Sequence, residues 1–146
     1  RYIDKLEKFD CVLTPDFSLY TDMPFAMQIW NVYRSRLIGS YWQSLGMTVI
    51  PTVSWSTHDS YNFCFDGLPQ NGTVAISTVG VMRNKAAKKL FYDGLDEMIA
   101  RIHPKYILIW GQEVDYDFPP EIGVMYFKDA RIERVRKEYN GRKRKQ

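Results

Sequence analysis

The sequence predicts a single α/β domain in which four or five mostly parallel strands are joined by crossover helices. Apolar, β-branched segments alternate along the chain with segments of helical periodicity, an order typical of a parallel sheet. The apolar segments lack period-two alternation, as expected of strands that are buried on both faces. At 146 residues, the chain is long enough to form one hydrophobic core. These observations leave an open sheet and a partial barrel as alternatives.

The first third of the chain contains two predicted helices and one predicted strand. "RYIDKLEKF" (residues 1–9) has the pattern of an amphipathic helix, and "CVLTP" (residues 11–15) is a short apolar strand. A long helix is expected over residues 24–45, because Pro suits the first turn and Gly46 suits the position just past the end. Since the chain starts without Met inside a helical pattern, we expect further residues upstream.

The long helix carries a wide apolar stripe, which we expect to pack against the sheet. Apolar residues recur at a spacing of four, at Ile29, Tyr33, Leu37, Tyr41 and Leu45. The opposite face carries Asn31, Arg34 and Ser35, which we expect to be solvated. Thr21 and Asp22 precede this helix and are expected to cap its N-terminus.

The rest of the chain supplies three or four more strands and one more helix. The expected elements are a strand over 47–55 with a bulge or edge at Pro51, a strand over 73–81, a helix over 84–103, a strand over 105–111 and a weaker fifth strand in "MYFKDA" (125–130). The stretch between the second and third strands is rich in turn residues, with one short helical turn in "YNFCF".

The charge is unevenly distributed and divides the chain into a domain, residues 1–130, and a basic segment, residues 131–146. The segment has eight basic and two acidic side chains, whereas the domain has twelve and fifteen. Such a segment attracts phosphates without sequence preference, so it predicts nucleic-acid binding, with Arg142, Lys143, Arg144 and Lys145 as contacts. A segment that only improves solubility is the alternative.

Several classes of function lack their motifs in this sequence. There is no Walker loop, no GxGxxG and no GxSxG, which disfavours known phosphate cradles and serine hydrolases. The absence of HExxH and CxxC disfavours zinc. A magnesium site of Asp16, Asp59 and Glu113 is chemically conceivable, but the spacing does not support it. We therefore predict no metal site, and no cofactor can be named.

The chain has neither an apolar run of membrane-spanning length nor a signal-peptide pattern. We therefore expect a cytoplasmic protein with no membrane partner. Cys11 and Cys64 both have apolar neighbours and are expected to be buried, reduced thiols. The oligomeric state cannot be predicted.

Polar and aromatic residues follow each of the first four predicted strands. In parallel α/β folds, the carboxyl ends of the strands meet at one edge, where ligands bind. The catalytic candidates at these strand ends are Asp16, Ser18, His58 and Glu113, and the ligand-binding candidates are Trp55, Ser77, Trp110 and Gln112. A carboxylate held at a strand end suits acid–base chemistry, and indole rings can stack on a base or a sugar.

Each of these candidates has a plainer alternative. Asp16 follows Pro15 and could cap a turn through its side chain. His58 could be an ordinary surface residue, and Trp55 and Trp110 could pack in the core or at its rim. The sequence does not decide between an enzyme with a small-molecule ligand and a non-catalytic protein that binds nucleic acid or a host protein.

Four motifs resemble an uncharacterised family, domain of unknown function number forty-four-seventeen, found in bacteria, archaea, phages and other mobile elements. They are "PDFSLYTDMP", "QIWNVYRSR", "YWQSLGMTVIPTVSW" and "AISTVGV". The likeness runs from Phe9 to Gly111, and the family usually has Ser in place of Thr14. The resemblance implies a phage or mobile-element context and an additional segment upstream of the first helix. It implies no catalytic residue, because no activity is established for the family.

Overall fold

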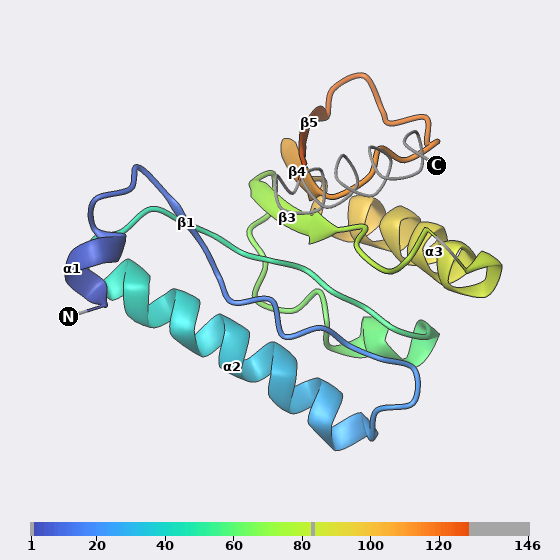
Figure 1. Cartoon of the computed structure of the whole chain (residues 1–146), viewed down its shortest axis with the longest axis horizontal. Coiled ribbons are helices and arrows are strands. Elements are labelled where there is room, and N and C mark those ends of the chain that lie inside the picture. Colours follow the sequence, from blue (N-terminus) through green and yellow to red (C-terminus); the bar gives the residue numbers. More distant parts are fainter. Residues whose placement is uncertain (1, 83, 129–146) are drawn as a thin grey trace, which may run out of the picture.

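A computed structural model describes residues 2–82 and 84–128 of the chain (Figure 1). Its helices are α1 (Ile3–Leu6), α2 (Phe25–Ser44), the 3-10 helix η1 (His58–Asn62) and α3 (Lys85–Ile102). Its strands are β1 (Val12–Leu13), β2 (Val49–Ile50), β3 (Thr73–Ser77), β4 (Tyr106–Trp110) and β5 (Gly123–Phe127). The predicted basic segment, residues 131–146, lies outside the described residues.

The strands are parallel and follow the order of the sequence. β1 pairs with β2, and β3, β4 and β5 form a second parallel sheet. A parallel bridge between Thr52 and Ala75 links the two sheets, just after Pro51 interrupts β2. The predicted mostly parallel α/β fold is therefore confirmed, and the sheets are open rather than closed into a barrel. β1 and β2 are much shorter than expected.

Helix α3 and the three-stranded sheet form the main hydrophobic core. Asn84 caps α3 by accepting hydrogen bonds from the backbone N–H groups of Ala86 and Ala87. The buried side chains of α3 are Phe91, Leu95, Met98 and Ile102, and they belong to one core cluster with Val74, Ile76, Ile107 and Ile109. These four side chains recur at a spacing of three or four residues, so the apolar face of the helix is the buried one.

Helix α2 has the opposite orientation to the one predicted. Its buried residues are Gln28, Asn31, Ser35 and Gly39, whereas large apolar side chains are exposed. The exposed set comprises Phe25, Met27, Ile29, Trp30, Tyr33, Leu37, Tyr41 and Leu45. The prediction failed because the strand-end loops beneath α2 present backbone carbonyls, which need hydrogen-bond donors rather than apolar contacts.

Two smaller predictions also need correction. Neither Thr21 nor Asp22 caps α2, because Pro24 occupies the N-cap position and makes no side-chain cap bond. Of the two thiols predicted to be buried, Cys64 is buried, but Cys11 is exposed just before the two-residue strand β1. Both thiols are free, as expected.

Candidate ligand-binding site at the strand ends

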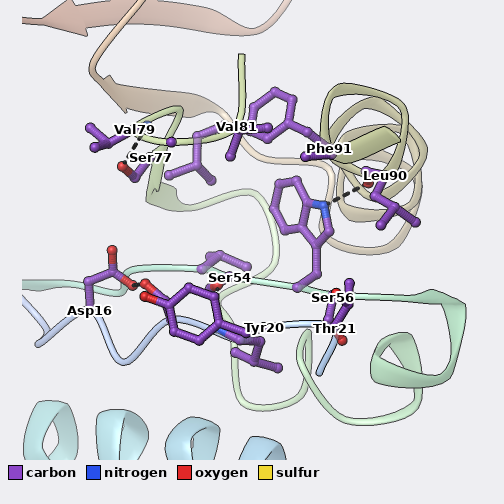
Figure 2. Close-up of a pocket in the computed structure, with 17 residues that line it drawn as sticks. Asp16, Tyr20, Thr21, Ser54, Ser56, Ser77, Val79, Val81, Leu90 and Phe91 are labelled. Carbon is purple, nitrogen blue, oxygen red and sulfur yellow. Dashed lines mark hydrogen bonds between the residues drawn. The ribbon is translucent and has the colours of Figure 1, made fainter. Parts of the chain in front are cut away.

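A cavity of about 450 Å³ lies where the chain leaves β1, β2 and β3. Its walls come from residues 16–21, 53–56 and 76–81 and from the first turns of α3. Figure 2 shows Asp16, Tyr20 and Ser54 on one side, Ser77, Val79 and Val81 on the opposite side, and Leu90 and Phe91 of α3 at one end. Three of the four strand ends predicted to form a site therefore meet around one cavity.

The polar face of α2 holds the first of these loops in place. Asn31 Nδ2 donates to the carbonyl oxygen of Ser18 at 3.0 Å, and Ser35 Oγ donates to that of Pro15 at 3.0 Å. At the far end of the loop, Gln28 Nε2 donates to the carbonyl of Met23 at 2.9 Å. The stretch from Thr14 to Pro24 is thus fixed along its length by side chains of the next helix.

A second network ties this loop to the segment that follows β2. Thr14 Oγ1 accepts a hydrogen bond from the backbone N–H of Thr52 at 2.8 Å, and Ser35 Oγ lies 3.1 Å from the same hydroxyl. The N–H of Leu19 donates to Ser54 Oγ at 3.1 Å. The hydroxyl of the buried Thr14 makes both of these contacts, and a Ser at this position would supply the same hydroxyl.

These positioning residues are also periodic in the sequence, but the prediction from the apolar stripe assigns their face to solvent. Gln28, Asn31 and Ser35 are spaced by three and four residues, so they mark one face of the helix as clearly as an apolar stripe does. Arg36 was missed altogether. Its guanidinium donates to three backbone carbonyls, those of Thr52, Cys64 and Asp66, at 3.0–3.1 Å.

Asp16 is the charged residue among the side chains that line the cavity. Ser18 Oγ donates to its Oδ1 at 3.4 Å, so two candidates from one strand end lie together. The carboxylate is accessible from the cavity, yet the surrounding protein partly desolvates it and raises its pKa above the usual 3.8, with the Ser18 bond acting in the opposite direction. Asp16 can therefore accept a hydrogen bond or a proton from a ligand.

Trp55 and Ser77 also line the cavity, although both have structural partners. The indole Nε1 of Trp55 donates to the carbonyl of Leu90 at 3.1 Å, and the ring packs beside Phe91 with centroids 5.5 Å apart. This fixes Trp55 as part of a rigid wall. Ser77 Oγ accepts from the N–H of Val79 at 3.3 Å, which leaves its own proton available to a ligand.

The remaining candidates lie outside the cavity. His58 begins η1, where its ring is exposed and packs against Tyr61 with centroids 4.9 Å apart. Trp110 and Glu113 are exposed at the fourth strand end. There the backbone N–H of Gln112 donates to Thr78 Oγ1 at 2.7 Å, which ties this loop to the back of the cavity wall.

Two features are absent from the described part of the chain, a metal-binding cluster and a membrane-spanning helix. Among residues 2–82 and 84–128, no group of three or more His, Cys, Asp or Glu side chains is arranged to hold a metal ion. Asp16, Asp59 and Glu113 are thus not brought together. The same residues include no helix that is long and apolar enough to cross a membrane. Arg142, Lys143, Arg144 and Lys145 lie outside the described residues.

These features define the class of protein: an open parallel α/β domain with a cavity at the ends of its first three strands. The chain belongs to the family described as a domain of unknown function (DUF4417), which residues 1–128 match. This confirms the resemblance seen in the sequence.

Two phage proteins are similar to this chain. It is 52% identical to the Gene 1 protein of Mycobacterium phage L5 and 47% identical to the Gene 1 protein of Mycobacterium phage D29, in each case over 112 residues. The matches cover 77% of this chain but 49% and 42% of the two relatives, so the chain spans about half of their length or less. No solved structure matches the chain.

Proposed function

We propose that this domain binds a small molecule in the cavity at the strand ends, with Asp16 as the anchoring group. The observation that supports this proposal is the convergence of three strand ends on one cavity with a partly desolvated carboxylate at its edge. Its volume of about 450 Å³ falls in the range of roughly 300–1,000 Å³ that is usual for small-molecule sites. Loops held by buried side-chain bonds, as here by Asn31 and Ser35, suit a preformed site.

The lining indicates the kind of ligand. No Lys, Arg or His is among the described residues that line the cavity, and Asp16 is the charged group there. A phosphate would meet this carboxylate with no cation among the described lining residues to offset the repulsion, so nucleotides bound through their phosphates are disfavoured. An amine or a ring N–H directed at Asp16 fits better, with the hydroxyls of Ser18, Ser54 and Ser77 nearby and an apolar wall opposite. We therefore favour a neutral or cationic compound with an apolar body.

The same arrangement would allow catalysis on such a ligand. A carboxylate with a raised pKa holds a proton more readily than an ordinary aspartate, which suits a general base or acid. Ser18 would position the carboxylate through its hydrogen bond. Binding is nevertheless the first activity to test, because it does not depend on knowing the reaction.

A thermal-shift screen tests the proposal, with panels of amines, nucleobases, nucleosides, sugars and phosphorylated compounds. A ligand present at 100 times its dissociation constant stabilises a fold by about 2.7 kcal/mol. We expect a shift from an amine or a base that disappears in Asp16→Asn. Asp59→Asn, an exposed carboxylate outside the cavity, is the matched control and should keep the shift. A hit that Asp16→Asn leaves unchanged would show that Asp16 is not the anchor.

A second candidate function rests on the basic segment alone. Residues 131–146 carry eight basic side chains, which would bind nucleic acid through phosphates. Binding of a short oligonucleotide should then weaken steeply with added salt and be lost in Arg142→Ala/Lys143→Ala/Arg144→Ala/Lys145→Ala. Binding that is insensitive to both changes would exclude this role.

A further inference from the structure

The outer face of α2 is an apolar surface that the cavity and its ligand do not use. This face is formed by Trp30, Tyr33, Leu37 and Tyr41 along the middle of the helix and by Met27, Ile29 and Leu45 around them, whereas Phe25 packs edge-on against Phe63 and does not belong to it. All seven of these residues are between 42% and 56% exposed. In Figure 1, α2 lies along the border of the molecule, and one of its sides meets no other described element. Contiguous exposed apolar surface of this kind marks an interaction site.

The face also lacks charge. The charged residues of α2 are Arg34 and Arg36, and both guanidinium groups are engaged elsewhere. Arg34 lies over the ring of Phe17, with its guanidinium carbon 3.6 Å from the centroid, and Arg36 donates to three backbone carbonyls beneath the helix. A partner for the outer face therefore needs no complementary charges, and two copies of the face would meet without repulsion.

The size of the face suits a dimer. A large side chain has about 200 Å² of surface, so seven that are half exposed offer roughly 700 Å², close to the roughly 800 Å² that one partner contributes to a standard interface. Interfaces between identical chains are also richer in apolar and aromatic groups than other interfaces. A two-fold axis needs only one self-complementary patch, which one helix can provide by pairing with its copy.

From these observations we infer that the outer face of α2 binds the same face of a second copy of this chain. Trp30, Tyr33, Leu37 and Tyr41 form the centre of the interface, and the two α2 helices lie against each other. No residue of α2 lines the cavity, so the interface is built from residues that the ligand site does not use.

Sedimentation equilibrium of the full chain at roughly 100 μM tests this inference, because interfaces of standard size have dissociation constants of about 1 μM or below. A high salt concentration suppresses any self-association that depends on the charges of the basic segment. We expect a mass of twice 17.2 kDa for the unmodified chain. Leu37→Glu, at the centre of the face, should give a monomer with an unchanged circular dichroism spectrum. Ser40→Glu places a charge on the same face without removing an apolar side chain and should also dissociate the dimer.

Met125→Glu is the matched control, because Met125 is 50% exposed on β5 and Leu37 is 52% exposed on α2. This control should remain dimeric. The inference is overturned if the unmodified chain is a monomer under these conditions, which would leave the face to a different protein. It is equally overturned if Met125→Glu dissociates the dimer and the two α2 variants do not, since the contact would then lie at the edge of the sheet.

Discussion

At the scale of single residues, Asp16 makes stability depend on pH in a direction that can be worked out. Burial raises its pKa in the folded protein above the usual 3.8, so the folded chain keeps a proton that the unfolded chain has released. The stability that this group contributes is complete below 3.8 and is lost as the pH rises through the folded value. Asp16→Asn cannot ionise and should therefore unfold at a higher temperature than the unmodified chain at neutral pH.

Thermal denaturation over a range of pH checks this prediction. The difference in unfolding temperature between Asp16→Asn and the unmodified chain should disappear as the pH falls below 3.8, because the unmodified side chain is then also neutral. Asp59→Asn, where the carboxylate is exposed, serves as the control. A variant that is less stable at neutral pH would instead mean that the charged form of Asp16 is stabilised by partners within the fold.

A second prediction at this scale concerns Gly94, which lies on α3 directly beneath the indole of Trp55. A Cβ at this position would overlap Nε1 and the neighbouring ring carbons, and the indole is fixed by its bond to Leu90. Gly94→Ala should therefore destabilise the fold by about 1–3 kcal/mol, although Ala normally favours a helix. Urea denaturation measures this change. In a Trp55→Leu background, Gly94→Ala should lower the free energy of unfolding by less. An equal loss in both backgrounds would show that the indole is not the cause.

At the scale of secondary-structure elements, the buried polar side chains of α2 are expected to contribute more to stability than its exposed polar side chains. Asn31 is buried and bonds the carbonyl of Ser18, so Asn31→Ala leaves that carbonyl without this donor and should cost about 1–3 kcal/mol. Gln43→Ala removes an exposed amide from the same helix and should change stability by less than about 0.5 kcal/mol. Denaturation of the two variants by urea compares them. Equal effects would contradict this account of α2.

The two long helices also show what periodicity can and cannot predict. In α3 the apolar face is the buried one, because it meets strands with apolar side chains, so the sequence was enough. In α2 the pattern predicts where the helix lies and distinguishes its two faces. It does not predict which of the two faces turns inward. That choice depends on the loops beneath α2, whose carbonyls need the amides of Gln28 and Asn31. Local periodicity does not show which backbone carbonyls elsewhere in the chain need a hydrogen-bond donor.

The same reasoning applies to the candidate site. Asp16, Ser18, Trp55 and Ser77 line one cavity because the carboxyl ends of parallel strands meet at one edge, and the parallel direction of the strands is what the sequence pattern predicts. Trp110 is the last residue of the equally clear strand β4 but does not line the cavity. After it, Gly111 takes a φ of +121°, and the next N–H bonds Thr78. The path of such a turn depends on one backbone angle and one tertiary bond, which periodicity does not encode.

At the scale of the whole molecule, the two thiols provide a test of how the fold opens. Cys64 is completely buried in the core cluster that includes Leu95 and Ile107, and burial raises the pKa of its thiol to about 12. Thiolate is the reactive form, so Cys64 should react only when the core opens, whereas Cys11 is exposed. A chromogenic disulfide reagent should therefore modify one thiol per chain rapidly and a second one slowly.

Cys11→Ser should abolish the rapid phase and leave the slow one, whose rate then reports opening of the core. Denaturant should make both thiols of the unmodified chain react rapidly, because unfolding exposes Cys64 to solvent. Gly94→Ala, which disturbs the packing of α3 against Trp55, should accelerate the slow phase, since a less stable core opens more often. Two rapid thiols in the native protein would show that the cluster around Cys64 opens locally, without unfolding of the rest of the core.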